Sequence, residues 1–294
     1  MHALKTYSEL KQLFMKKVAN HYSFREQEQL FFWVLFHLTK WSKVDFSMHR
    51  NNLVKEHYFE RCLSIIEQLN LGKPIQHILG FTSFYELDLK VNNNTLIPRP
   101  ETEELVSYVL EDINPKDVFN VIDIGTGSGC IALALKQQRE FINIIGVDVS
   151  DEALEVAKFN AEKLKLDIRY IMDDITRPNK KYPQLDYVIS NPPYIPQCEL
   201  NSIPTVVRNH EPHLALFVHD NDPLFFYKSI LAFCHLKLKN RGKIFFEIHE
   251  DFGDEMVNLI SDNHYSNIEL KKDLQGKNRF IKAIKFEQKS QRKN

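Results

Sequence analysis

The sequence predicts an α/β protein: a large domain with a mostly parallel sheet, preceded by a small all-helical domain and a β-hairpin linker. Three observations support this fold class. Apolar residues recur at three- and four-residue spacing up to about residue 72, the period changes to two near residue 84, and short apolar strands alternate with helical stretches from residue 101. Such alternation is typical of βαβ units. We therefore expect a helical domain at residues 1–72, a linker at 73–98 and the α/β domain at 99–294.

The composition is that of a globular chain. Its 294 residues, 43% of them hydrophobic, suffice for one large and one small core. The longest apolar run, Leu30 to Leu38, is too short to cross a bilayer, and we recognise no export signal. The four cysteines are scattered without metal-binding spacing, so we expect reduced thiols, no metal site and a cytoplasmic location. The formal charge of −1 offers no basic field for nucleic acid, so we expect no direct nucleic-acid binding.

Helix and turn signals support the helical domain and the linker. Ser23 followed by Glu26 has the pattern of a capping box ahead of the apolar run "QLFFWVLFHL". A later helical pattern ends at Gly72, a residue suited to the turn that follows a helix. The segment "FYELDLKV", residues 84–91, alternates apolar and polar residues and is predicted to be one half-buried strand. Three asparagines, residues 92–94, then favour a turn, which predicts a hairpin.

Five short apolar segments of the α/β domain are predicted to be strands, because helical stretches separate them. In chain order they are "NVIDIG", "INIIGVDV", "IRYIM", "DYVIS" and "GKIFFEI". The carboxyl ends of parallel strands meet at one edge of a sheet, where open α/β sheets bind ligands. The residues that follow each strand are therefore the candidates for a site.

A glycine-rich loop follows the first of these strands. Gly125, Gly127 and Gly129 stand between "VIDI" and a helical run that starts at about Cys130. Glycines let the backbone turn tightly and approach a ligand that faces the free N–H groups of the following helix. The spacing lacks the third glycine position of the dinucleotide fingerprint and the lysine of a P-loop, which disfavours hydride transfer and nucleotide hydrolysis.

Acidic side chains lie at or near the ends of the neighbouring strands. Asp148 lies 23 positions after Gly125, where a carboxylate can accept both ribose hydroxyls of an adenosine. Asp174 can accept from an adenine amino group while Ile175 packs on the ring, and Asp123 can orient the loop or a ligand's amino group. Ordinary turn and cap residues remain the alternative for the glycines and Asp148, an N-cap for Asp174, and a structural carboxylate for Asp123.

The stretch "SNPPYIP" ends the fourth strand in a rigid polar turn. Each proline restricts the residue before it, so Pro193 and Pro192 hold the Asn191 side chain and the Pro192 carbonyl in fixed directions. Two convergent acceptors suit an NH2 group on a planar, conjugated carbon, because that group offers two donors. Binding both hydrogens favours the tetrahedral geometry of attack, and Tyr194 offers a flat face for stacking. The turn predicts alkylation of a planar amine; a stiff loop with a packed tyrosine is the alternative.

Together these residues resemble the class I S-adenosylmethionine-dependent methyltransferases, which have a Rossmann-like domain, and more narrowly the release factor glutamine methyltransferase family, also called the HemK or PrmC family. The segments that carry the resemblance occur in the family's order over nearly the whole chain: "GKPIQHILG", "FYELDLKV", "TLIPRPETEELV", "DIGTGSGCIALAL", "GVDVS", "VISNPPYIP", "RNHEPHLALF" and "KKDLQGKNRF". "IPRPETE" and "EPHLAL" separate this family from other enzymes with an NPPY turn.

The resemblance implies transfer of a methyl group from S-adenosylmethionine to the side-chain amide of the glutamine in the Gly-Gly-Gln loop of bacterial-type peptide chain release factors. The turn Asn191, Pro192, Pro193 and Tyr194 would hold this amide, and the helical domain would help to grip the release factor. The residues expected to bind the cofactor are Asp123, Gly125, Thr126, Gly127, Ser128, Gly129, Asp148, Asp174, Ile175 and Asn191. We expect a monomer.

Some positions depart from the family pattern. The family usually has glycine where this chain has His249, and often has glycines where this chain has "VHDND". Position 175 is commonly aromatic, so Ile175 is expected to stack less well on adenine. We assign His249 no catalytic role, because amide methylation requires no imidazole. Arg99 and Glu211 are expected either to order the substrate pocket or to form a supporting ion pair.

Two other functions remain alternatives. An adenine-N6 or cytosine-N4 nucleic-acid methyltransferase faces the same chemical problem, because it also alkylates an exocyclic amine. Such an enzyme must flip a base and grip phosphates, which the balanced charge disfavours for DNA. A non-catalytic binding protein of the translation machinery is the second alternative, disfavoured by the intact glycine loop, Asp148 and Asn191.

Overall fold

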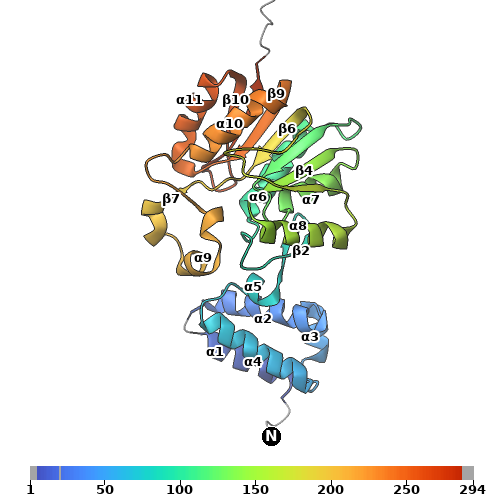
Figure 1. The fold of residues 1–294 in the computed structure, drawn as a ribbon. Helices are drawn as coiled ribbons and strands as arrows, with labels where there is room; N and C mark the ends of the chain where they lie inside the picture. The colour runs from blue at the N-terminus through green and yellow to red at the C-terminus, as the bar shows by residue number, and fades with distance from the viewer. Residues whose placement is uncertain (1–4, 20, 287–294) are drawn as a thin grey trace, which may run out of the picture. The chain divides into compact units, whose positions relative to one another are not determined.

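The computed structural model describes residues 5–19 and 21–286; residues 1–4, 20 and 287–294 of the two expected domains lie outside the described part. The described residues form two compact units (Figure 1). One comprises the chain up to Gly80 together with Thr205–His210, and the other comprises the rest.

The first unit is helical, as expected. Its elements are α1 (Tyr7–Val18), α2 (Phe24–Thr39), α3 (Lys43–His49), α4 (Glu56–Asn70), α5 (Ile75–Leu79) and α9 (Thr205–His210). The capping box of Ser23 and Glu26 is confirmed, because each side chain accepts the backbone N–H of the other residue. The unit continues past residue 72, since α5 adds Ile75 and Ile78 to the same apolar core.

A β-hairpin begins the second unit. Strands β1 (Phe81–Phe84) and β2 (Leu87–Lys90) are antiparallel, with Phe84 opposite Leu87. A hairpin is present in the linker, but the predicted strand over residues 84–91 and the predicted hairpin turn at residues 92–94 are wrong, because the chain reverses at Tyr85 and Glu86. Both residues have positive φ, 48° and 63°. Asn and Gly favour such turns, so these two residues give no sign of the reversal in the sequence.

The second unit is built on a seven-stranded sheet with the order β10-β11-β9-β6-β3-β4-β5. The strands are β3 (Asn120–Ile124), β4 (Asn143–Asp148), β5 (Arg169–Met172), β6 (Leu185–Ser190), β9 (Leu238–Glu247), β10 (Tyr265–Lys272) and β11 (Asn278–Lys285). The five predicted strands are confirmed, and the four pairings among them are parallel. β11 and β10 extend the sheet by antiparallel pairing, which was not predicted.

Helices cover both faces of this sheet (Figure 1). On one face pack α6 (Pro100–Asp112), α7 (Cys130–Gln138) and α8 (Asp151–Leu164); on the other pack α10 (Phe225–Lys237) and α11 (Gly253–Asp262). Alternate strand residues point to opposite faces, so Val121 joins the first apolar core and Ile122 joins the second. A short parallel pair, β7 (Ile195–Pro196) and β8 (Phe217–Val218), follows the polar turn. No described helix is long and apolar enough to span a membrane.

Candidate active site

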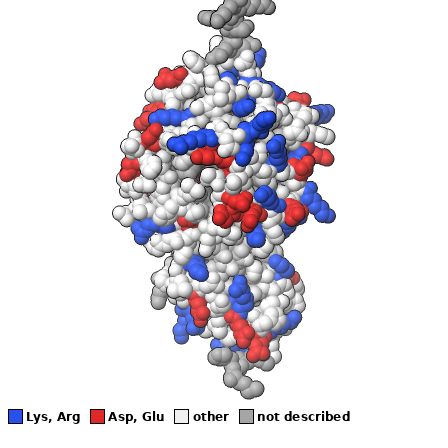
Figure 2. Space-filling model, viewed as in Figure 1, with Lys and Arg blue, Asp and Glu red and all other residues white. Residues whose placement is uncertain are grey.

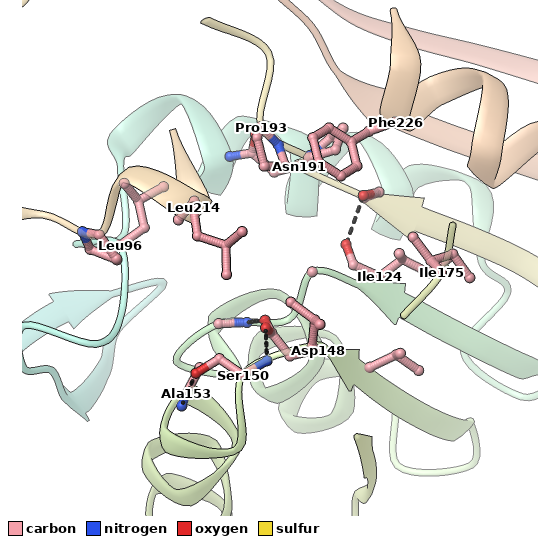
Figure 3. A pocket seen from close by; sticks show the side chains of 18 of the residues that line it. Leu96, Ile124, Asp148, Ser150, Ala153, Ile175, Asn191, Pro193, Leu214 and Phe226 are labelled. Atoms are coloured by element: carbon pink, nitrogen blue, oxygen red, sulfur yellow. Dashed lines mark hydrogen bonds between the residues drawn. The ribbon is translucent and has the colours of Figure 1, made fainter. Parts of the chain in front are cut away.

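A cavity of about 240 Å³ lies at the carboxyl ends of β3, β4 and β6 (Figure 3). It brings together the first glycines of the loop, the acid that ends β4, the acids that follow β5, and the polar turn after β6. The lining residues that were predicted for the site are Gly125, Gly127, Asp148, Asp174, Ile175, Asn191, Pro192 and Pro193. Most of the predicted site therefore converges on one cavity, because adjacent parallel strands end at the same edge of the sheet.

The glycine loop has the backbone conformation that its sequence predicts. Gly125, Gly127 and Gly129 have φ values of 73°, 54° and 82°, in the left-handed region that favours glycine. The N–H groups of Gly125 and Thr126 donate to the Val147 carbonyl at 2.8 and 2.9 Å, which ties the loop to the end of β4. Gly125 and Gly127 face the cavity, whereas Gly129 is the residue from which α7 starts.

Gly129 is the loop glycine with the tightest surroundings. A Cβ there would lie 2.7 Å from the Tyr170 hydroxyl and 3.2 Å from both Ala157 Cβ and Leu133 Cδ1. We expect Gly129→Ala to lower the free energy of unfolding by about 2–4 kcal/mol, from backbone strain plus overpacking. Gly276→Ala is the matched control, because φ is 85° and no atom lies within 4 Å of its Cβ position. It isolates the backbone strain, about 1–2 kcal/mol. Urea unfolding measures both; equal losses would contradict the packing argument.

Asp148 lies at the end of β4 and faces the cavity (Figure 3). Its Oδ2 accepts the Gly127 N–H at 2.8 Å, and its Oδ1 accepts the Ser150 N–H at 3.0 Å. Burial raises the pKa of this carboxyl, against the lowering effect of those N–H donors. Each carboxylate oxygen retains a second lone pair, so Asp148 can still accept hydroxyl groups from a ligand in the cavity.

Asp123, Thr126 and Ser128 lie beneath the loop and do not line the cavity. Asp123 is fully buried, and its Oδ2 accepts the Thr126 hydroxyl at 2.6 Å. Its Oδ1 has no hydrogen-bond partner among the described residues, and neither does the buried Ser128 hydroxyl. Burial raises the pKa of Asp123 to about 7. In this arrangement Asp123 holds the loop through Thr126, which is one of the two roles that the sequence left open.

The acids after β5 shape another wall of the cavity. Asp174 and Ile175 line it, and Asp174 Oδ1 also accepts the N–H and hydroxyl of Thr176 at 2.9 and 2.7 Å. Asp174 thus stabilises a local turn; no helix starts there, so the expected N-cap is not seen. Sequence reasoning missed Asp173, which is buried and accepts the Tyr182 hydroxyl at 2.8 Å.

The polar turn lies beside the glycine loop. Ser190 closes β6, and its hydroxyl donates to the Ile124 carbonyl at 2.7 Å, which holds the ends of β6 and β3 together. Asn191 and the two prolines line the cavity (Figure 3). Tyr194 is not among the lining residues: its ring packs against the apolar core that α10 covers, and its hydroxyl donates to Glu247. The stacking face expected of Tyr194 is therefore not part of the cavity wall.

The segments around Arg99 and Glu211 supply further parts of the cavity wall. Glu211 is buried and accepts from Arg99 Nη2 at 2.5 Å and from the Ile97 N–H at 3.1 Å. This ion pair joins the segment before α6 to the segment after α9. Both segments supply lining residues that sequence reasoning missed: Asn94, Thr95, Leu96, Pro212, Leu214 and Ala215. Arg99 and Glu211 do not touch the cavity, so of the two expected roles the supporting ion pair is the one seen.

His249 lies outside the cavity. Its Nδ1 accepts the Asp251 N–H at 3.2 Å, where it caps the short helix η3 (Glu250–Phe252). Because Nδ1 accepts, a neutral ring carries its proton on Nε2, which lies 3.3 Å from Glu199 Oε2. Its position is that of a cap residue.

The chain is similar to known methyltransferases over most of its length. Residues 104–214 match the Methyltransferase small domain, and residues 20–80 match the PrmC N-terminal domain. It is 38% identical to a release factor glutamine methyltransferase of Flavobacterium psychrophilum, covering 92% of this chain and 96% of that protein. It is 34% identical to the enzyme of that name from Staphylococcus aureus, covering 85% and 89%.

A solved structure agrees with the fold. The hMettl16 catalytic domain, solved in complex with the MAT2A 3′UTR hairpin 6, superimposes with a TM-score of 0.55 at 16% identity, covering 87% of this chain and 93% of that one. At this identity the similarity shows a shared fold only. The sequence identity over nearly the whole length is the stronger finding: the chain belongs to the release factor glutamine methyltransferase family.

Proposed function

We propose that this protein transfers a methyl group from S-adenosylmethionine to the side-chain amide nitrogen of the glutamine in the Gly-Gly-Gln loop of bacterial peptide chain release factors. The observation that carries the proposal is the position of Asn191 and its two prolines, on the wall of the same cavity as Gly127 and Asp148. An acceptor for a planar amide and a site for an adenosine thus lie side by side.

The cavity has the chemistry that S-adenosylmethionine requires. Asp148 offers carboxylate oxygens for ribose hydroxyls, and the glycine loop leaves space for close approach of a ligand. Apolar side chains suited to the adenine ring come from four segments: Val149, Ile175, Leu214 and Phe226. We propose that the ring lies among them, with Asp174 near its amino group. The cofactor supplies an electrophilic methyl group on sulfur.

The protein's own contribution is to bind and orient the amide. The amide nitrogen is a weak nucleophile, because its lone pair is delocalised into the carbonyl. Asn191 Oδ1 and the Pro192 carbonyl would each accept one of its hydrogens, which favours the pyramidal nitrogen of the transition state over the planar ground state. The prolines restrict the backbone, so these acceptors are held in place before the substrate binds and lose little entropy on binding. No strong base is needed before the attack.

We also propose that the helical unit, residues 5–80 with α9, contacts the release factor, because the reacting loop alone is too small to define a protein substrate. The match of residues 20–80 to the PrmC N-terminal domain supports this role. All four cysteines are free thiols, which supports a reducing, cytoplasmic location. We propose that the protein acts as a monomer.

The charge distribution favours a protein substrate over nucleic acid. Figure 2 shows basic and acidic side chains mixed on the visible face, without a continuous basic surface. Three lysines of the strands β9 and β11 are paired: Lys239 with Asp186 at 2.7 Å, Lys282 with Glu269 at 2.9 Å, and Lys243 with Asp112. Paired lysines release few counterions, so they contribute little to phosphate binding.

Methyl transfer to a bacterial release factor and to nucleic acid, measured side by side with isotopically labelled S-adenosylmethionine, tests the proposal. We expect labelled protein, and a rate that changes little between low and physiological salt. Labelled nucleic acid with a steep loss of activity in salt would instead support the exocyclic-amine alternative. Cofactor binding without transfer to either would support the non-catalytic alternative.

A further inference from the structure

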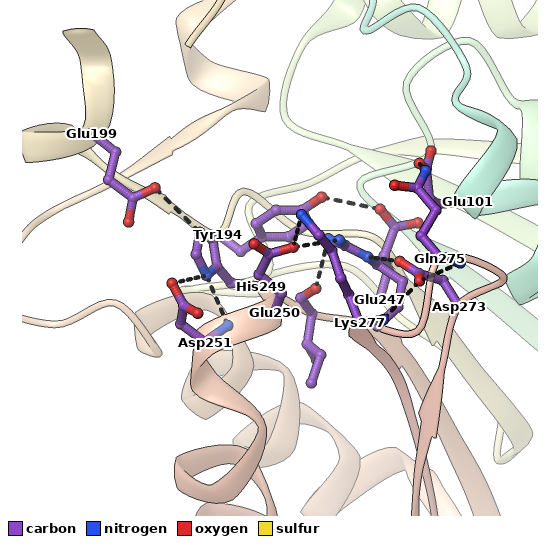
Figure 4. Close-up of polar contacts among 12 residues, drawn as sticks. Glu101, Tyr194, Glu199, Glu247, His249, Glu250, Asp251, Asp273, Gln275 and Lys277 are labelled. Carbon is purple, nitrogen blue, oxygen red and sulfur yellow. Dashed lines mark hydrogen bonds and ion pairs between the residues drawn. The ribbon is translucent and has the colours of Figure 1, made fainter. Parts of the chain in front are cut away.

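A chain of side-chain hydrogen bonds leads from the cavity wall into the protein. Asn191 Nδ2 donates to Thr102 Oγ1 at 3.2 Å, and Thr102 Oγ1 donates to Glu247 Oε2 at 2.8 Å. The other oxygen of Glu247 accepts the Tyr194 hydroxyl at 3.1 Å (Figure 4). Three separate segments meet here: the first turn of α6, the end of β9 and the polar turn after β6.

The members of this chain are held firmly. Thr102 and Glu247 are 3% and 2% exposed. The backbone carbonyl of Glu247 accepts the buried Tyr227 hydroxyl at 2.8 Å, which fixes the end of β9. The positive charge of Arg279 acts on the Glu247 carboxyl, and Asp273 Oδ2 holds that guanidinium through Nε at 3.1 Å. These contacts favour the ionised form of Glu247, against the larger opposing effect of its burial.

The directions of these hydrogen bonds follow from the chemistry of each group. An ionised carboxylate only accepts, so both the Thr102 and the Tyr194 hydroxyls must donate to Glu247. A hydroxyl has one proton, and Thr102 has used its proton on Glu247, so toward Asn191 it can only accept. The end of the Asn191 amide that faces Thr102 must then be the NH2 group, and Oδ1 must point away from Thr102.

We propose that Thr102 and Glu247 are positioning residues that fix which end of the Asn191 amide is presented to the substrate. This inference rests on the proposed function and identifies what keeps its acceptor in place. Asn191 lines the cavity, so the Oδ1 end is available to the NH2 group of the substrate glutamine. A flipped Asn191 amide would bring two NH2 groups together and lose the acceptor.

The ionisation of Glu247 adds a pH dependence. Burial raises the pKa of Glu247 to about 7, while the hydroxyls of Thr102 and Tyr194 and the charge of Arg279 act to lower it. Other titratable groups whose charges interact with Glu247 are Glu101, Cys130 and Tyr227. Protonation lets Glu247 donate, which frees Thr102 from its fixed direction. Turnover at saturating substrates should therefore fall as the pH drops through about 7.

The experiment compares Thr102→Val, which keeps the shape and loses the hydroxyl, with Thr102→Ser, which keeps the hydroxyl. We expect kcat for Thr102→Val to fall about 10- to 100-fold, less than for a group that touches the substrate, with unchanged affinity for S-adenosylmethionine. Thr102→Ser should restore kcat to within about threefold of wild type. Glu247→Gln should lose turnover and also the low-pH decline. Ser107→Ala, which removes a hydroxyl from the same helix, is the matched control.

A readout without turnover separates this inference from the proposed function. In 15N-labelled protein free of ligand, the side-chain NH2 signals of Asn191 should shift in Thr102→Val and stay near their wild-type positions in Thr102→Ser and Ser107→Ala. Wild-type kcat or unshifted Asn191 signals in Thr102→Val would overturn the positioning role. An inactive wild-type protein would contradict the proposed function alone, because the Asn191 signals would still test the network.

Discussion

Asn191→Ala is expected to lower kcat for methyl transfer by at least about 10²- to 10³-fold, the loss found when one preorganised hydrogen-bonding group is removed from a reacting centre. Without Oδ1 the substrate amide loses an acceptor that acts mainly in the transition state. The fold should survive, because within the described part of the chain the side chain makes one hydrogen bond, to Thr102, and lies on the cavity wall. Single-turnover kinetics and thermal unfolding measure the two effects separately.

Asn143→Ala is the matched control for this variant. It also removes an asparagine amide with one hydrogen bond, Nδ2 to Asn120 Oδ1 at 3.2 Å, but at the opposite end of β4 from the site. Its kcat should equal that of wild type. Turnover within a few-fold of wild type in Asn191→Ala would show that the polar turn does not hold the reacting amide.

Asp148→Ala is expected to weaken the binding of S-adenosylmethionine by about 100-fold or more, since hydrogen bonds to a charged group contribute about 1.5–3 kcal/mol each. The variant removes the acceptor for the ribose and also frees the Gly127 N–H, which donates to Asp148 at 2.8 Å. Calorimetric titration of the purified protein with S-adenosylmethionine measures the change directly.

The control for the lost charge is Asp151→Asn. Asp151 starts α8 close to Asp148 in the sequence, but its side chain is 63% exposed and 4.0 Å from its partner Lys158. Its substitution should leave the affinity unchanged. An affinity for Asp148→Ala within twofold of wild type would rule out this carboxylate as the ribose acceptor.

Local sequence patterns predicted those parts of the site whose conformation is set by residues adjacent in the sequence. The glycines of the loop, the acid at the end of β4 and the polar turn after β6 each carry their own signal, because tight turns and rigid backbone need particular residue types. The parallel sheet then brings them to one edge, as βαβ topology requires. Asp148, Gly127 and Asn191 accordingly line one cavity.

Contacts between distant segments were not predictable in the same way. Thr102 meets both Asn191 and Glu247 because α6 packs against the sheet beside the end of β9. The segment "IPRPETE" marks the family, but nothing in it or around Glu247 predicts these contacts. From its place after the prolines, Tyr194 was expected to stack on the planar group of the substrate. Its hydroxyl instead donates to Glu247. The prediction of a continuous strand through Tyr85 and Glu86 failed because both residues have positive φ, which residues of their type rarely adopt.

The departures from the family pattern fall at different distances from the chemistry. Ile175 lies in the cavity wall, so its smaller contact area compared with an aromatic residue would lower the affinity for the cofactor. His249 instead caps η3 and lies 3.3 Å from Glu199 in η1 (Gln197–Asn201), the helix that follows β7 (Figure 4). It therefore bears on the shape of a loop beyond the polar turn.

The most direct test of amide methylation is fragment mass spectrometry of a purified bacterial release factor after incubation with this protein and S-adenosylmethionine. A release factor with asparagine in place of the loop glutamine is incubated beside it. We expect a single added methyl group on the loop glutamine and no addition to the asparagine variant. A methyl group at any other residue, or no transfer from a protein that binds the cofactor, would contradict the proposed substrate.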